Sequence, residues 1–198
     1  MSIMRVKTLL GDDFHKSCMT LCDRVKVDYT PNLIIGILTG GGYVGREISN
    51  EWPDADYSEI RIQRKDTAKK EEGFRHIILQ ALPYFMLNWL RMAEMAYEGL
   101  KAKKYIPKRE GCVELSPEID IMLKEKKTNI LLVDDAIDTG ATLKLIKETF
   151  SDRYPLATIK IAVVTVTSNH PLIDADYYLF HDRTLVRFPW SNDVKRKK

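Results

Sequence analysis

The sequence predicts an α/β fold with a mainly parallel sheet flanked by helices. Two continuous apolar runs, at residues 33–38 and 129–133, carry this prediction. Neither run has the apolar–polar alternation of a half-exposed strand, and strands that are buried on both faces are typical of parallel sheets. Segments with helical spacing follow both runs, and this alternation of strands and helices indicates βαβ connections.

The first third of the chain predicts helix, strand, helix and strand in turn. Apolar residues recur at helical spacing over residues 12–25, after aspartates that can cap a helix. The apolar strand at 33–38 ends in a glycine-rich turn, and a second helix is expected to follow through residues 45–50. Isoleucines alternate with charged residues over 57–63, as in a half-buried strand.

The middle of the chain is expected to be an insertion. Residues 65–73 form a charged loop, and residues 74–104 have a helical pattern. Apolar side chains surround the axis of this helix, so it must be buried or lie in an interface. A homodimer interface and a cap over a binding pocket are the two alternatives. We expect a single domain, 1–198, with a helical or flexible insertion at about 65–125.

Regular alternation returns in the last third of the chain. Apolar β-branched residues mark its longer strands, and apolar residues on one side mark its helix. The expected elements are an irregular segment at 107–118, a buried strand at 129–133, a loop at 134–142, a helix at 142–150, and strands at 158–167, 176–180 and 184–188.

The charge balance argues against a nucleic-acid partner. The 198 residues carry a formal charge of +3, but the last four residues are all Lys or Arg. Without them the body has 27 basic and 28 acidic residues, so it is close to neutral. No aromatic residues are interleaved with the basic tail, which we therefore expect to be a solvated terminus.

Cysteine usage and hydropathy indicate a cytoplasmic protein without a membrane partner. The three cysteines are Cys18, Cys22 and Cys112, an odd and sparse set that fits a reducing compartment. Cys18 and Cys22 share one helix face with apolar neighbours, which favours burial over metal binding. Residues 1–10 lack the apolar core of a signal peptide. The longest uncharged stretch, residues 77–90, is shorter than the roughly 20 residues that span a bilayer.

The segment with the most chemical information is residues 131–142. A buried strand there delivers Asp134 and Asp135 at its carboxyl end, where open α/β sheets bind ligands. Residues 139–142 are small and precede a helix, so their backbone N–H groups can bind a phosphate. Two carboxylates repel a phosphate unless a cation or a sugar lies between them. The residue types therefore predict a phosphorylated sugar, with its hydroxyls or Mg²⁺ at the acidic pair.

This segment resembles the motif with which type I phosphoribosyltransferases bind 5-phosphoribosyl 1-pyrophosphate (PRPP). That motif is a hydrophobic strand, two acidic residues, two apolar residues and then Asp-Thr-Gly-x-Thr, and every part of it is present. A strand–turn–helix with capping side chains explains single residues of the motif but not three carboxylates followed by Thr-Gly-x-Thr. The resemblance implies Mg²⁺ as cofactor, at Asp134 and Asp135. It implies that PRPP binds to Asp134, Asp135, Ala136, Ile137, Asp138, Thr139, Gly140, Ala141 and Thr142.

The glycine-rich turn resembles the pyrophosphate loop of the same family. The residues concerned are Thr39, Gly40, Gly41 and Gly42. Glycine suits such a loop because the backbone must approach an anion closely and adopt unusual dihedral angles. Taken alone, three glycines after a strand also fit a plain tight turn. Family members often have Arg or Lys immediately before the Gly-Gly pair, where this chain has Gly40.

The motif Phe-Pro-Trp at 188–190 resembles a signature of bacterial purine-type members such as xanthine-guanine phosphoribosyltransferase. In that group the residues just upstream, here Leu185 and Val186, contact the base. Two departures concern the choice of base. Residues 168–170, Ser-Asn-His, stand where a Lys usually follows the strand, and Leu185 replaces the aromatic residue that stacks on the base.

The resemblance also implies roles in the reaction. Asp134 and Asp135 would bind the ribose hydroxyls and the metal shell. Asp138 would be the general base or hydrogen-bond acceptor at the base nitrogen, with a helix N-cap as its alternative role. The charged loop at 64–73 would close over the site and exclude water, although a solvated charge run is the alternative.

The sequence therefore predicts a Mg²⁺-dependent enzyme that transfers 5-phosphoribosyl from PRPP to a nitrogenous, purine-like nucleobase and releases pyrophosphate. The alternative is a non-catalytic PRPP- or nucleotide-binding regulatory module of the same fold. Asp138 and the glycine-rich turn favour the enzyme, whereas the missing Lys favours the regulator. A hydrolase or kinase on another α/β fold is disfavoured because the chain has no nucleophile elbow and no P-loop.

Overall fold

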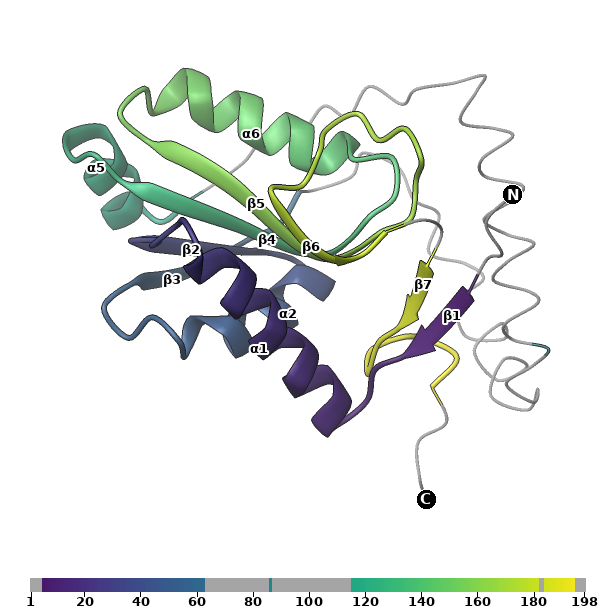
Figure 1. Cartoon of the computed structure of the whole chain (residues 1–198). Helices are drawn as coiled ribbons and strands as arrows, with labels where there is room; N and C mark the ends of the chain where they lie inside the picture. The colour runs from purple at the N-terminus through teal and green to yellow at the C-terminus, as the bar shows by residue number, and fades with distance from the viewer. Residues whose placement is uncertain (1–4, 63–85, 87–114, 182–183, 195–198) are drawn as a thin grey trace.

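A computed structural model describes residues 5–62, 86, 115–181 and 184–194 of the chain (Figure 1). Its larger sheet has five strands in the order β3-β2-β4-β5-β6, and every neighbouring pair is parallel. The predicted α/β class with a parallel sheet is confirmed. The strands are β2 (Leu33–Ile37), β3 (Asp56–Ile60), β4 (Asn129–Ile137), β5 (Thr158–Val166) and β6 (Tyr177–Phe180).

Helices cover both faces of this sheet. Figure 1 shows α1 and α2 on one face and α5 and α6 on the other. The helices are α1 (Asp12–Lys26), α2 (Gly40–Ser49), α5 (Pro117–Glu125) and α6 (Ala141–Arg153). Each layer has its own apolar cluster, with Ile34 and Leu131 facing the first pair of helices and Ile35 and Leu132 the second. Both faces of the central strands are therefore buried, which explains their continuous apolar sequences.

Cys18 and Cys22 lie in the core between α1 and the sheet, as the helical spacing predicts. Both are buried, free cysteines. Burial raises the pKa of each thiol to about 12, so both stay protonated at neutral pH.

A second, two-stranded sheet lies beside the carboxyl ends of the larger sheet (Figure 1). It pairs β1 (Arg5–Thr8) with β7 (Thr184–Arg187) in parallel. The Thr165 hydroxyl at the end of β5 donates to the Thr184 carbonyl at 2.7 Å, which joins the two sheets. The sequence predicts β7 but not β1, because three of the four residues of β1 are exposed and no apolar pattern marks the strand.

Strand β4 is longer than predicted. The sequence analysis expects a loop from residue 134, but the backbone continues as strand to Ile137, which pairs with Val166 of β5. Asp134 and Asp135 therefore lie on the strand itself. Hydropathy missed these last four residues because they carry two carboxylates at the point where the strand leaves the core.

Two further elements correct the sequence analysis. Helix α2 begins at Gly40, so the three glycines form its first turn rather than a separate turn before it. Helix α5 occupies 117–125, where the analysis expects the end of an irregular segment and of the insertion. Its start has an ordinary signal: the Ser116 hydroxyl accepts from the backbone N–H of Ile119, and proline follows at the first helical position.

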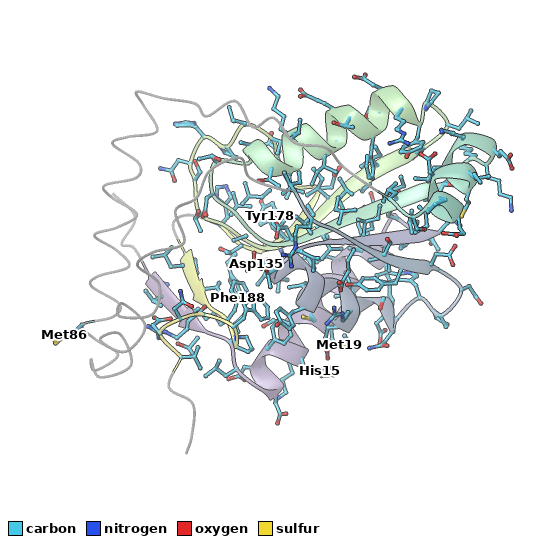
Figure 2. The ribbon with its side chains drawn as sticks, turned by 180° about the vertical axis from the view of Figure 1, so that it is seen from behind. His15, Met19, Met86, Asp135, Tyr178 and Phe188 are labelled. Carbon is cyan, nitrogen blue, oxygen red and sulfur yellow. The ribbon has the colours of Figure 1, made fainter. Side chains whose placement is uncertain are left out.

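The charged loop at 65–73 lies outside the described residues, as does the apolar helix predicted at 74–104 apart from Met86. Met86, the one residue described there, is helical and partly exposed (Figure 2). Among the residues that the structure describes, no helix combines the length and the apolar character needed to span a membrane.

Candidate active site

The topology of the larger sheet creates one natural ligand crevice. Strands β2 and β4 are neighbours, but the chain continues outward from them in opposite directions, to β3 on one side and β5 on the other. Open α/β sheets bind ligands at the carboxyl ends of the strands at such a reversal. The glycine turn after β2 and the acidic end of β4 meet here.

A cavity of about 470 Å³ lies at this point, and we call it the switch-point cavity. It brings together most of the residues that the sequence nominates, although they come from three separated parts of the chain. Gly41 and Gly42 are exceptions, because they are buried within the first turn of α2 and do not line the cavity. The nominated residues that line it are Thr39, Gly40, all nine residues of 134–142, Leu185 and Val186.

The glycines of α2 are explained by their contact with β4. A Cβ atom at Gly40 would lie 2.0 Å from Oδ2 of Asp135, and one at Gly41 would lie 2.4 Å from the carbonyl oxygen of Val133. Neither glycine has a positive φ, so the expectation of unusual dihedral angles is wrong at these positions. Side chains are absent here because α2 starts in direct contact with the acidic strand end.

The acidic pair is partly buried at the floor of the cavity. Oδ1 of Asp134 accepts from the backbone N–H of Asp135 at 2.9 Å, and Oδ2 of Asp135 accepts from Nε1 of Trp190 at 3.0 Å. Burial raises the pKa of both carboxyls, and the neighbouring charge of Asp135 raises that of Asp134 further. Because the ionised forms of these two neighbouring carboxyls are disfavoured, a cation bound between them would stabilise the charged pair.

The raised pKa of Asp134 predicts that Asp134→Asn stabilises the metal-free protein at neutral pH. Between the ordinary pKa of 3.8 and the raised value, the folded state binds more protons than the unfolded state. Stability therefore falls as pH rises through that window, and the penalty is fully present above it. Asn removes the charge and keeps an acceptor for the Asp135 N–H.

We expect the Asn variant to gain about 0.5–2 kcal/mol in free energy of unfolding at pH 7, measured with urea in the presence of a chelator. The gain should shrink as pH approaches 3.8, the ordinary pKa of the aspartate side chain. A variant that is less stable than the wild type at pH 7 would contradict this electrostatic account.

The start of α6, with residues 139–142, lies where the sequence predicts a phosphate cup. Gly140 is the N-cap, with φ of 76°, a left-handed conformation that favours glycine. No side chain caps the helix, although the N–H of Ala141 makes a long contact of 3.4 Å with the Thr139 hydroxyl. The first-turn N–H groups therefore face the cavity with the positive end of a 13-residue helix behind them.

Asp138 does not cap this helix, so the N-cap alternative is wrong. Its side chain is exposed toward the cavity, and Oδ1 accepts from the Thr167 hydroxyl at 2.5 Å. Thr167 is itself buried beyond the end of β5, and its hydroxyl also lies 3.2 Å from the carbonyl oxygen of Ile137. One carboxylate oxygen of Asp138 is thus held while the side chain remains accessible to a ligand.

The sequence analysis did not nominate several residues that line the cavity. Thr165 lies at the end of β5 and Thr167 just beyond it. Polar residues at the end of a buried strand are the sequence signal that could have nominated them. Phe188 and Trp190 belong to the Phe-Pro-Trp motif, for which the sequence analysis predicted a role only for the preceding residues, Leu185 and Val186. Asp135 and Phe188, which both line the cavity, are labelled near each other in Figure 2.

Part of the lining of the cavity is apolar. Leu185, Val186 and Phe188 supply one wall, and Ile62 lies at the end of the described segment that follows β3. In the ranges that the structure describes, the lining contains three carboxylates and no Lys, Arg or His side chain. Among these described residues, backbone N–H groups, hydroxyls and a bound cation are what could bind an anionic ligand.

The donor set fits Mg²⁺ bound together with a substrate. The described part of the chain has no group of three or more His, Cys, Asp or Glu side chains that could enclose a metal by themselves. Mg²⁺ is commonly bound by one or two carboxylates, with phosphate oxygens and water completing its shell. Asp134 and Asp135 supply that number of carboxylates next to the phosphate cup.

Comparisons with solved structures show a shared fold. A purine phosphoribosyltransferase from Pyrococcus horikoshii Ot3 has a TM-score of 0.60 at 20% identity, with 95% of each chain covered. The Helicobacter pylori xanthine-guanine-hypoxanthine phosphoribosyltransferase has a TM-score of 0.62 at 17% identity, with 94% of each chain covered. A Neisseria gonorrhoeae protein with bound ppGpp also has a TM-score of 0.62, at 12% identity, with 96% of this chain and 91% of that chain covered.

Sequence comparison assigns the family. A search of curated proteins found no match. A family model described as the phosphoribosyl transferase domain matches residues 15–194, which is most of the chain. The chain therefore belongs to the phosphoribosyl transferase domain family and is an enzyme of the phosphoribosyltransferase class.

Proposed function

We propose that this enzyme transfers the 5-phosphoribosyl group of PRPP to a ring nitrogen of a neutral, purine-like base, with Mg²⁺ as cofactor and pyrophosphate as the second product. One observation carries the proposal: the switch-point cavity joins an uncapped helix N-terminus, an acidic pair and a glycine turn. These are the groups that would bind a phosphate, a ribose and a pyrophosphate in that order.

The order of these groups gives an orientation for PRPP. The 5′-phosphate would bind the N–H groups and threonine hydroxyls of residues 139–142, where the helix dipole favours an anion. The ribose hydroxyls would donate to Asp134 and Asp135. The pyrophosphate would lie at the backbone of 39–42, because Gly40 directly adjoins Asp135.

Mg²⁺, held by Asp134 and Asp135, would supply positive charge that neutralises the leaving pyrophosphate. The protein's own contribution there is the direction of these carboxylates, each of which has one oxygen already fixed by a hydrogen bond. The pair would also stabilise positive charge that develops on the ribose ring in an oxocarbenium-like transition state.

Asp138 would accept the proton of the base. A ring nitrogen forms the new bond to C1 of the ribose while the bond from C1 to the pyrophosphate oxygen breaks. The proton on the attacking heterocycle passes to the carboxylate oxygen of Asp138, whose other oxygen is held by Thr167. The exposure of Asp138 to the cavity supports this assignment.

The lining also supports a neutral acceptor. The three carboxylates of the lining disfavour a heterocycle that itself carries a carboxylate. The apolar wall of Leu185, Val186 and Phe188 fits the face of a flat ring. The purine phosphoribosyltransferases among the structural neighbours support a purine over other neutral bases.

Pyrophosphate release tests the proposal. The purified chain would be given PRPP, Mg²⁺ and a panel of neutral purines, pyrimidines and carboxylated heterocycles. We expect release that depends on a purine, and none when a chelator replaces Mg²⁺. If no base supports turnover while PRPP still raises the Tm, the regulatory alternative is correct and the proposed reaction is wrong.

A further inference from the structure

We propose that Trp190 is a positioning residue for the acidic pair: its indole N–H fixes one oxygen of Asp135 so that the other is held ready for the ribose or the metal shell. The inference rests on the proposed function and adds a residue from the far end of the chain to its site. The contact that carries it joins Nε1 of Trp190 to Oδ2 of Asp135 at 3.0 Å.

The indole ring is fixed by its aromatic neighbours. It stacks between Tyr43, with ring centroids 4.7 Å apart and planes at 14°, and Phe188, at 4.8 Å and 6°. The ring of Phe14 meets Trp190 edge-on at 5.4 Å and 88°. Contacts on both faces and at an edge leave the ring little freedom to rotate, so its N–H has a defined direction.

The backbone that carries the indole is fixed as well. Nε of Arg187 donates to Oδ2 of Asp193 at 2.8 Å, and both side chains are almost fully buried. Between these residues, the N–H of Phe188 donates to the Ser191 hydroxyl at 2.9 Å, and the N–H of Ser191 donates to the Phe188 carbonyl at 3.0 Å. We call residues 187–193 the C-terminal clamp. It is a closed turn with Trp190 near its centre.

The clamp connects the acidic pair to the glycine turn. Tyr43, which stacks on Trp190, lies in the first turn of α2, three residues after Gly40. Gly40 itself adjoins the carboxylate of Asp135, where even a methyl group would overlap. Asp135 therefore lies between the backbone of Gly40 and the indole N–H of Trp190. The same indole stacks on Tyr43 of α2, so Trp190 contacts both the acidic pair and the helix that begins at the glycines.

The alternative explanation is that Asp135 merely accepts a hydrogen bond from a partly buried indole. Two observations favour a role in the site instead. The acceptor is one carboxylate of an acidic pair that lines the cavity, and Trp190 itself lines the same cavity.

Trp190→Phe separates the two explanations because it keeps an aromatic ring in the stack while it removes the N–H donor together with the smaller ring of the indole. We expect the Kd for PRPP in the presence of Mg²⁺, measured by calorimetry, to rise about 10- to 100-fold, the range for loss of a hydrogen bond to a charged group. Phe14→Leu is the matched control. It weakens packing against the same indole, leaves the N–H in place, and should lower the Tm without changing the Kd.

A spectroscopic measurement tests the contact without substrate. The chain has three tryptophans, so its ¹⁵N spectrum should show three indole N–H signals, and Trp190→Phe identifies the one that belongs to residue 190. We expect Asp135→Ala to move that signal upfield in the proton dimension and to leave the other two in place. The same signal should respond when PRPP and Mg²⁺ are added to the wild type.

The outcomes distinguish this inference from the proposed function. If the wild type binds PRPP and Trp190→Phe binds it equally well, the positioning role of Trp190 is wrong and the proposed function stands. If the chemical shift of the Trp190 indole N–H is unchanged in Asp135→Ala, the positioning role of Trp190 is also wrong. If the wild type does not bind PRPP with Mg²⁺, the proposed function fails and the positioning role fails with it.

Discussion

Asp138→Asn should lower kcat by about 100- to 10,000-fold, the contribution of a well-placed general base, and leave PRPP binding largely intact. Asn preserves the size of the side chain and an oxygen that can accept from the Thr167 hydroxyl. It cannot take the proton of the attacking heterocycle. The loss should therefore appear in the chemical step, measured by single-turnover formation of the nucleotide.

The matched control is Asp152→Asn, which removes an exposed carboxylate from α6 outside the residues that line the cavity. It should leave kcat and PRPP affinity unchanged. Two results would contradict the assignment of Asp138: full activity in Asp138→Asn, or a loss of PRPP binding that accounts for the whole defect. The second result would make Asp138 a binding residue.

Asp193→Asn should be among the most destabilising single substitutions, at about 3–5 kcal/mol in free energy of unfolding, because it removes a charge that pairs with a buried guanidinium. The side chains of Arg187 and Asp193 are only 2% and 5% exposed. Arg187 also donates to the Thr8 hydroxyl at 3.0 Å, and Leu9 donates to its carbonyl at 2.9 Å, so the pair supports the contact between β1 and β7.

The double variant Arg187→Met, Asp193→Leu is the control, because replacing both charges with apolar side chains removes the buried guanidinium together with the carboxylate. We expect it to be more stable than Asp193→Asn in urea unfolding followed by circular dichroism. Equal stability of Asp193→Asn and the wild type would show that the ion pair does not hold the C-terminal clamp. That result would also remove the structural basis for a fixed Trp190.

The parts of the fold that could be predicted are those in which one local signal decides the structure. Residues 33–37 and 130–133 are apolar on both faces, and only a strand covered by two helical layers satisfies them. The acidic pair followed by Thr-Gly-x-Thr likewise predicts one local structure, a strand end followed by a turn and the start of a helix. Both predictions rest on neighbours in sequence, which hydropathy and motif spacing can report.

Contacts between distant residues could not be predicted in this way. Trp190 and Asp135 are 55 positions apart, and no periodicity links them. The reason for Gly40 and Gly41 is also non-local, since the steric limit comes from Val133 and Asp135 on another strand. The N-cap alternative for Asp138 failed for the same reason, because its hydrogen-bond partner comes from beyond the end of β5.

The most direct test of the account is a ³¹P spectrum of the purified enzyme with PRPP, Mg²⁺ and a neutral purine. The account predicts that PRPP disappears while pyrophosphate and a nucleoside 5′-monophosphate appear in equal amounts, and that omitting the purine stops the reaction. PRPP that stays intact with every neutral base, or that breaks down to ribose 5-phosphate at the same rate without a base, would contradict it.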